Sequence, residues 1–369
     1  MKITCSKNNL LNGVSTVSKA VSNKTNMSIL QCILVDASGS EIKLLANNTE
    51  LGIETLIEGN IIDKGKIALD AKILSEIVRK LPDSEVTIEC DSSLKTYITC
   101  ENANFTIIGK PADEFTYLPK IERIDSIKLS QFTLKELVRQ TIFSIADNDN
   151  NKIMTGELFE VSGDVLKVVS LDGHRISIRK VNLKSSYDNK KVIVPGKTLN
   201  DISKILSGDA EKEVEIFFSG KHILFEFDNT VVVSRLIEGE YFKIDQMLSS
   251  DYETKMVINK KDLLDSIDRA MLLISESDKK PFIMNIKDEK IEVKINSAIG
   301  SMNESIAVDK KGKDLLIGFN PKFMMDALRV IDDEEISMYL VNPKAPCFIK
   351  NAEETYIYMV LPVNFTTVS

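Results

Sequence analysis

The sequence predicts an α+β fold made of three similar domains, each with two helices packed on antiparallel sheets. Three stretches of the 369-residue chain align without gaps, a second helix-like segment precedes each of them, and alternating strands follow each of them. The aligned stretches are KIALDAKILSEIVRKL (66–81), VIVPGKTLNDISKIL (192–206) and LIGFNPKFMMDALRVI (316–331). Lys72, Lys197 and Lys322 fall 125 residues apart in both steps, a repeat too long for a solenoid, so we expect each copy to carry its own core.

The first helix of each domain is predicted at 6–22, 130–146 and 259–275. In the first and third of these segments apolar residues recur at helical spacing, as in Leu10, Val14 and Val17. Ser6, Ser130 and Asn259 stand where N-caps belong. The second helices are predicted at 71–81, 196–206 and 320–331.

The strands are predicted from alternating segments that occupy matching places in the repeats. EVTIEC, EVEIFF and EISMYL follow the second helices, with HILFEF and VVVSRL continuing the middle copy, and EIKLLA, VLKVVS and KIEVKI lie between the helices. Periodicity lapses at 115–125 and 240–253, which predicts domains at 1–124, 125–251 and 252–369.

The composition is that of a globular chain, with 43% hydrophobic and 28% charged residues. No apolar run has the length of a membrane span and the N-terminus lacks a signal-peptide pattern, so we expect a cytoplasmic protein with no membrane partner. The five cysteines have no metal-ligand spacing, which predicts reduced, mostly buried thiols and no metal site. A disulfide between Cys90 and Cys100 is the alternative if their strands pair.

The charge is unevenly distributed. The whole chain carries a net −8, yet the six helical segments contain 14 Lys and Arg against 7 Asp and Glu. In each second helix two cations seven residues apart point away from the apolar face. A solvated helix face would explain one such pair; the same pair in three copies also suits a basic surface that binds duplex phosphates regardless of base sequence. The pairs are Lys72 with Arg79, Lys197 with Lys204, and Lys322 with Arg329.

Two enzyme motifs fail when their spacing is checked. Pro195-Gly-Lys-Thr198 resembles the end of a phosphate-binding P-loop, but Lys191 stands where that loop requires glycine. In SLDGHRISIRK (170–180), Ser170 and Asp172 lie too close to His174 along the chain to converge on it as a catalytic triad. We expect no catalytic residue, and a structural role for His222.

The turn DGHR occurs only in the middle repeat, because ANNTEL and NSAIGS occupy the matching positions in the other copies. A feature present in one copy of three indicates a local site. The apolar run Met359 to Val363 near the C-terminus is either a buried last strand or part of such a site.

Taken in order, these segments resemble the bacterial sliding clamp family, the β subunit of DNA polymerase III. The resemblance covers the whole chain, from MKITCSKNNLLNGV through SLDGHRISI, VIVPGKTLNDISKIL and IGFNPKFMMDAL to YMVLPV. It implies a head-to-tail homodimeric ring of six domains that encircles double-stranded DNA. It also implies no enzymatic activity and no cofactor. The implied partners are DNA polymerase subunits, other replication or repair proteins and an ATP-driven clamp loader.

The resemblance also implies three sets of site residues. The peptide-binding set for partner motifs is Met154, Leu171, Gly173, His174, Arg175, Ile176, Met247, Pro346, Met359, Val360, Leu361, Pro362 and Val363. The DNA-binding set is Lys24, Lys72, Arg79, Lys135, Arg139, Lys152, Lys197, Lys204, Lys322 and Arg329. The dimer-interface set is Ile73, Ile77, Phe105 and Ile107 on one end, facing Leu272 and Leu273 on the other.

The chain departs from the family pattern in places. EYFKIDQ stands where the family usually has proline followed by aspartate, Gln246 replaces a common arginine, and the loop DNDNNK is unusually acidic. These differences concern the pocket and its partners rather than the ring. A paralogue with an altered pocket and a nucleotide-using enzyme built on PGKT are the alternatives.

Overall fold

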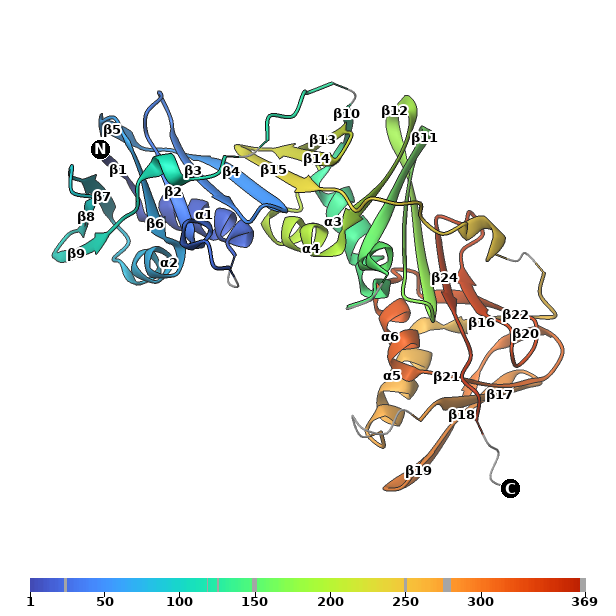
Figure 1. The fold of residues 1–369 in the computed structure, drawn as a ribbon. Helices are drawn as coiled ribbons and strands as arrows, with labels where there is room; N and C mark the ends of the chain where they lie inside the picture. Colours follow the sequence, from blue (N-terminus) through green and yellow to red (C-terminus); the bar gives the residue numbers. More distant parts are fainter. Residues whose placement is uncertain are drawn as a thin grey trace. The chain divides into compact units, whose positions relative to one another are not determined.

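The computed structural model describes residues 1–22, 25–117, 119–124, 126–147, 151–248, 251–274 and 280–365 (Figure 1). It divides the chain into two compact units: unit 1 is Met1–Lys135 with Lys197–Leu236, and unit 2 is Glu136–Gly196 with Ile237–Ser369. The division passes through the middle repeat because some of its strands pair into a sheet of unit 1 and the others into a sheet of unit 2.

Unit 1 contains two antiparallel sheets, with strand orders β5-β1-β7-β8-β9 and β10-β13-β14-β15-β4-β3-β2-β6. Their strands are β1 (Lys2–Ser6), β2 (Cys32–Asp36), β3 (Ile42–Asn47), β4 (Leu51–Ile57), β5 (Asn60–Asp63), β6 (Lys66–Asp70), β7 (Glu85–Cys90), β8 (Lys95–Cys100), β9 (Ala103–Ile108), β10 (Ser126–Ser130), β13 (Glu213–Ser219), β14 (His222–Phe227) and β15 (Thr230–Arg235).

Unit 2 also contains two antiparallel sheets, ordered β11-β12-β24-β23-β22-β16-β20 and β19-β18-β17-β21. Their strands are β11 (Gly156–Leu171), β12 (Arg175–Pro195), β16 (Thr254–Asn259), β17 (Phe282–Lys287), β18 (Lys290–Ser297), β19 (Gly300–Ala307), β20 (Asp309–Gly312), β21 (Leu315–Phe319), β22 (Glu335–Leu340), β23 (Cys347–Lys350) and β24 (Tyr356–Val360). The predicted strand segments of all three repeats are thereby confirmed.

Six α-helices form where the repeat predicts them. They are α1 (Lys7–Val17), α2 (Ala71–Lys80), α3 (Gln131–Arg139), α4 (Gly196–Ile205), α5 (Lys260–Met271) and α6 (Pro321–Val330). The predicted N-caps are confirmed: Ser6 accepts from the Asn9 amide, Ser130 from Thr133 and Asn259 from Asp262. Within their units, α1 lies beside α2 and α5 beside α6.

The first helices are shorter than predicted, and two of them tighten into 3₁₀ turns, at Ser18–Ala20 and Ile142–Ser144. Near each end a hydroxyl donates to the carbonyl four residues back: Ser18 Oγ to Val14 O and Thr141 Oγ1 to Leu137 O, both at 2.6 Å. Such bonds compete with the helical ladder. Apolar periodicity continues past these points, which is why it overestimates the helix lengths.

The second helices bury the apolar faces that the repeat predicts. Leu74, Leu199 and Met324 at the centres of these faces are fully buried, and the residues three and seven positions later are nearly so. Around Met324 the core of unit 2 gathers α5, α6 and both sheets. The cations of the second helices are therefore left on the outward sides.

Neighbouring repeats are joined in the same way at two places in the sheets. The last strand of the middle repeat, β15, pairs antiparallel with β4 of the first, and the last strand of the third repeat, β24, pairs antiparallel with β12 of the middle one. The corresponding last strand of the first repeat, β9, is the edge of its sheet, and so is β19 of the third repeat. Neither strand has a partner on its outer side within the described residues.

Candidate functional site

The DGHR turn is held by its own aspartate. Asp172 Oδ1 accepts hydrogen bonds from the backbone amides of His174 at 3.0 Å and Arg175 at 3.1 Å. Gly173 has φ +84°, a left-handed conformation that glycine adopts without steric cost. The predicted turn is thus a rigid loop between β11 and β12.

Arg175 anchors this loop to α6. Its side chain is buried, with Nε bonded to Asp172 Oδ2 at 3.0 Å and Nη1 to Asp326 Oδ2 at 2.6 Å. Nη2 donates to the carbonyl of Phe143. The guanidinium lies 4.4 Å from the ring centroid of Phe323 and 5.4 Å from that of Phe143. With each of its three side-chain nitrogens bonded inside unit 2, Arg175 is placed to position the turn.

His174 is exposed and is not part of a catalytic triad. Its ring stacks on Phe323 with centroids 5.9 Å apart and an interplanar angle of 24°. The buried Ser170 donates its hydroxyl to Thr141 O at 2.6 Å, and Asp172 is committed to the turn and to Arg175. The three side chains do not converge as acyl-transfer catalysis requires.

An apolar cluster surrounds the turn and contains several of the predicted peptide-binding residues. Leu171, Ile176 and Met359 are buried in it, with Met154 and Leu361 half-buried at its border. The Leu361 amide donates to His174 O at 2.9 Å, which joins the C-terminal segment to the turn. Leucine and methionine side chains exposed at such a border can accept the apolar anchors of a peptide.

The remaining members of that set are more dispersed. Met247 is 42% exposed and Val363 36% exposed, whereas Pro346 and Pro362 are half-buried. Val360 points away from Met359, as alternate residues of a strand do, and is buried in the main core of unit 2. Val360 therefore supports β24 from behind and does not contribute side-chain surface to the apolar cluster.

Four aromatic or acidic residues of this site were not predicted from the sequence: Phe143, Phe323, Asp326 and Tyr241. The first three hold Arg175 and His174, and Tyr241 is buried in the apolar cluster with its hydroxyl on Val169 O at 3.2 Å. Phe323 and Asp326 are three residues apart on α6, a spacing that places both on one helix face. The sequence holds no signal that this face meets the DGHR turn.

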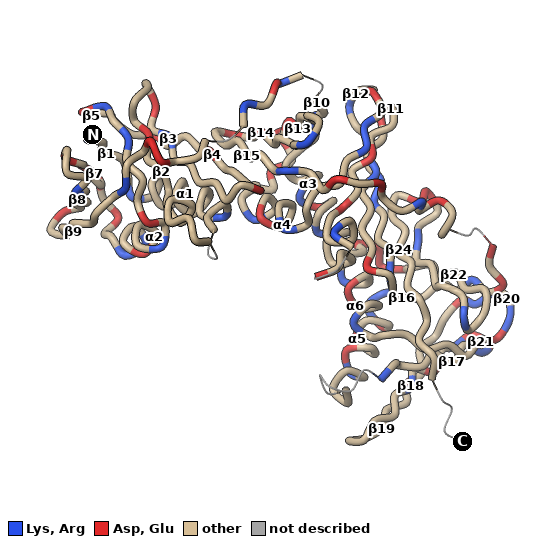
Figure 2. Tube along the Cα trace, viewed as in Figure 1, with Lys and Arg blue, Asp and Glu red and all other residues tan. Residues whose placement is uncertain are grey.

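The outward helix cations differ in how freely they can meet an anion. Lys72, Arg79, Lys197, Lys204 and Lys322 are exposed, and no ion pair joins any of them to a described residue. Figure 2 shows Lys and Arg along α2 and α6. Lys197 and Lys204 lie close enough to the half-buried Asp201 to counteract the rise in its pKa that burial causes.

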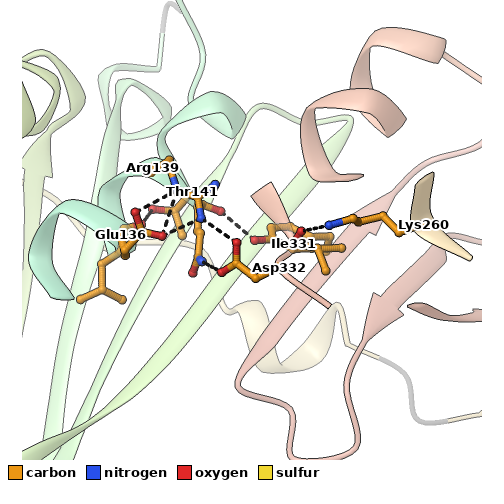
Figure 3. Close-up of polar contacts among 9 residues, drawn as sticks. Glu136, Arg139, Thr141, Lys260, Ile331 and Asp332 are labelled. Carbon is orange, nitrogen blue, oxygen red and sulfur yellow. Dashed lines mark hydrogen bonds and ion pairs between the residues drawn. The ribbon is translucent and has the colours of Figure 1, made fainter. Parts of the chain in front are cut away.

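Other members of the predicted DNA-binding set are engaged. Arg139 bonds to Glu136, three residues earlier, and to Asp332, with N–O distances of 2.6 and 3.2 Å (Figure 3). Arg329 lies 3.7 Å from Asp268. Lys135 donates to Leu206 O at 3.3 Å. Lys152 is exposed, and Lys24 lies outside the described residues.

The PGKT segment is a strand-to-helix junction. A Cβ on Gly196 would approach Ile145 Cδ1 to 2.2 Å and Thr155 O to 3.0 Å, so glycine is required there by packing. Pro195 ends β12 and Gly196 begins α4. This close contact accounts for the glycine without any bound phosphate.

The predicted dimer-interface residues include exposed apolar side chains: Phe105 and Ile107 lie on β9, and Leu273 lies beside Gly300 at the start of β19. Ile73 is 48% exposed, Phe105 38% and Leu272 78%, while Ile107 and Leu273 are half-buried. Ile77 is only 8% exposed and belongs to the apolar face of α2 inside its own unit. Large exposed apolar residues beside an unpaired strand are typical of an interface.

All five cysteines are free thiols, four of them buried, as expected. Cys90 pairs with Thr96 in the β7–β8 ladder and Cys100 with Ala103 in the β8–β9 ladder, so the alternative disulfide is wrong. None of the helices in the described part of the chain combines the length and apolarity needed to cross a bilayer.

Comparison with known proteins matches nearly the whole chain. Models of the DNA polymerase III beta subunit cover residues 1–119 (N-terminal domain), 128–243 (central domain) and 245–364 (C-terminal domain). The Beta sliding clamp of Bacillus subtilis is 35% identical, over 98% of this chain and 99% of that protein.

Solved structures agree. A putative DNA polymerase III beta subunit from Eubacterium rectale is 67% identical, with TM-score 0.97 over 99% of this chain and 100% of that one. The DNA polymerase sliding clamp of Bacillus subtilis is 34% identical, with TM-score 0.96 and the same coverage.

The fold is therefore that of a three-domain clamp, a non-catalytic class of protein. The chain belongs to the DNA polymerase III beta subunit family, the beta sliding clamps. The prediction from the resemblance is confirmed at the level of family, fold and function class.

Proposed function

We propose that two copies of this chain close head to tail into a ring that encircles duplex DNA, and that the ring tethers polymerases and other replication or repair proteins as a processivity factor. The observation that carries this proposal is the way the last strand of one repeat pairs with a strand of the preceding repeat. Because such a ring acts on chromosomal DNA, we expect the protein in the bacterial cytoplasm.

Ring closure results if the same strand pairing also forms between two copies of the chain. Each junction inside the chain joins the last strand of one repeat to a strand between the helices of the preceding repeat, as β15 joins β4 and β24 joins β12. Applied again, this pairing joins β9 of one copy to β19 of another, and three domains per copy make six in a dimer. Ile73, Phe105, Ile107, Leu272 and Leu273 would then be covered.

The DNA contacts in this proposal come from the outward cations of the second helices. Lys72, Arg79, Lys197, Lys204 and Lys322 present free charge from matching positions. Contacts of this kind bind phosphates without reading bases, as a protein that slides along DNA requires. Arg139 and Arg329 would contribute less, because carboxylates already neutralise them.

Partner peptides would dock on the apolar cluster beside the DGHR turn. His174, Met154 and Leu361 offer exposed or half-exposed surface there, and Arg175 holds the turn in place. A short apolar motif in an extended peptide suits such a surface.

The test of the ring combines solution mass with DNA retention. Wild-type protein should have twice the 41.3 kDa mass of the chain and should stay on closed circular DNA after loading, then leave once the circle is cut. Phe105→Arg, on the open edge β9, should yield monomer and abolish retention. Ile62→Arg, on the opposite edge β5, is the matched control, since Ile62 is 55% exposed and lies off the proposed interface. A wild-type monomer, or retention indifferent to cutting, would refute the ring.

A further inference from the structure

The outer face of the eight-stranded sheet in unit 1 carries a cavity of about 570 Å³, well within the range of ligand and peptide pockets. Its floor is apolar and comes from β14 and β15. Its walls come from β3, from Glu54 of β4, and from Tyr117, Pro119, Lys120, Ile121 and Arg123 between the first two repeats. The apolar lining includes Leu45, Ile121, Leu224, Val231 and Val233.

The equivalent position in unit 2 is filled. There the segment connecting the second and third repeats buries Tyr241 and Ile244 against Val169, Phe348 and Ile357. In unit 1 the connecting segment buries Phe115 and packs Ile121 against Leu224 and Val233, but it leaves Tyr117 47% exposed at the cavity mouth. The connecting segment thus covers the sheet in both units, but in unit 1 it leaves a cavity beside Val231 and Tyr117.

The charges around the cavity favour an acidic occupant. Lys43 is paired with Glu54 at 3.1 Å, and Arg123 with Glu226 at 2.7 Å. Lys120 is exposed on the rim, and among the described residues it forms no ion pair. An apolar floor beside an unmatched cation complements an apolar side chain flanked by a carboxylate.

We propose that this cavity is a second docking site, for an extended segment of a partner protein with one apolar anchor residue next to Asp or Glu. The anchor occupies the floor formed by Leu224, Val231 and Val233, and the acidic flank pairs with Lys120. The site lies wholly within unit 1, on residues distinct from those of the DGHR turn, and it does not depend on ring closure.

The probe is an array of hexapeptides with one Leu or Phe flanked by two Asp or Glu in a Gly/Ser background, together with a second array carrying Lys in place of the acids. Full-length protein should bind the acidic array more tightly than the basic one. Val231→Arg should weaken that binding at least tenfold by filling the cavity; Arg is tolerable there because Val231 lies directly opposite Glu54 in the ladder. Lys120→Glu, an exposed change that leaves the fold intact, should weaken it at least threefold.

His174→Ala is the matched control and should leave this binding unchanged. Three outcomes overturn the proposal: equal binding of the two arrays, acidic-array binding that survives both Val231→Arg and Lys120→Glu, or binding lost in His174→Ala alone. The last outcome would place the peptides at the DGHR turn. None of these outcomes bears on the dimer mass, so failure here is distinguishable from failure of the ring.

Discussion

The two units repeat the same elements but use their charged side chains differently. In unit 1, Lys72, Arg79, Lys197 and Lys204 meet no carboxylate within ion-pair distance among the described residues. In unit 2 the arginines are held: Arg139 by Glu136 and Asp332, Arg329 by Asp268, and Arg175 by Asp172 and Asp326. Lys322 is the free cation of its helix.

This contrast shows that the repeat determines which cations are exposed, whereas residues of other elements determine which of them are paired. The register of a helix decides which side chains point outward, so cations at matching positions are exposed in both units. Whether an outward cation is free depends on carboxylates from other elements. Unit 2 supplies these carboxylates around Arg175 and thereby fixes the DGHR turn, whereas the second helices of unit 1 keep their cations unpaired among the described residues.

The largest expected effect comes from breaking the Arg175 network. Arg175→Ala removes the cation between Asp172 and Asp326 and leaves both carboxylates partly buried and unpaired. Losing one partner of such a network costs about 3 kcal/mol or more. We expect a clear fall in the urea midpoint of unfolding and weaker binding of peptides at the DGHR turn.

Lys72→Ala in unit 1 is the matched control for that loss. Lys72 is exposed and forms no ion pair, so its removal should change the free energy of unfolding by less than about 0.5 kcal/mol. Equal midpoints for the two variants would show that the network around Arg175 contributes nothing to stability.

The next largest effect concerns Glu157, a fully buried carboxyl on β11. Neither of its oxygens has a hydrogen-bond partner among the described residues, and the nearby Thr141 hydroxyl donates to Leu137 O instead. Burial raises the pKa of Glu157 from 4.5 to about 8. The nearby Thr141 hydroxyl offsets this rise in pKa only in part, because that hydroxyl already donates to Leu137 O.

The sign of the pH dependence follows from that raised pKa. Between pH 4.5 and 8 the folded chain keeps a proton on Glu157 that the unfolded chain releases, so the stability present below pH 4.5 is lost as the pH rises toward 8. Glu157→Gln mimics the protonated form. It should raise the free energy of unfolding at pH 8 by roughly 2–4 kcal/mol and have little effect at pH 4.5.

Glu160→Gln on the same strand is the control, with the opposite sign. Although burial opposes it, the hydrogen bond and charge of Lys167, with the charge of Lys191, hold the pKa of Glu160 below its ordinary value. Its contribution is therefore present above the ordinary glutamate pKa and lost as the pH falls through the folded-state value. If both variants shifted stability in the same direction at pH 8, the proposed protonation of Glu157 would be wrong.

The sequence predicts the fold well because the repeat is strong and local. Strand alternation, N-caps and helix faces depend on residues a few positions apart, and three copies report the same pattern. The helix ends at Val17 and Arg139 were missed because a single hydroxyl, on Ser18 or Thr141, overrides the apolar periodicity.

The candidate site is less predictable because its neighbours are far apart in sequence. Asp326 meets Arg175 across 151 residues and Asp332 meets Arg139 across 193. No local pattern in α6 reveals that Phe323 will stack on His174. The resemblance to a family supplies the turn as a site, but only the tertiary contacts show that Arg175 positions that turn while His174 faces solvent.

A smaller effect is expected in DNA binding, where the two groups of cations can be compared directly. Lys72→Ala combined with Lys197→Ala should lower the slope of log affinity against log salt concentration by about 2, since each phosphate contact contributes about 0.9. Arg139→Ala should change the slope by less than about half of one contact, because Glu136 and Asp332 already neutralise it. A loss for Arg139→Ala as large as for one lysine would show that its ion pairs open on DNA.

The smallest expected effect is at the DGHR turn itself. Gly173→Ala forces an L side chain into φ +84°, which costs about 1 kcal/mol although nothing lies within 4 Å of the added carbon. Gly39→Ala in a turn of unit 1 is the matched control: its surroundings are equally open and its φ is not positive, so stability should stay unchanged or rise slightly. Peptide affinity at the turn should fall only for Gly173→Ala, because only there does the backbone hold His174 against Phe323. If the two substitutions changed the free energy of unfolding equally, the left-handed conformation of Gly173 would not be needed to fix the turn of unit 2, and the contrast with the turn of unit 1 would not hold.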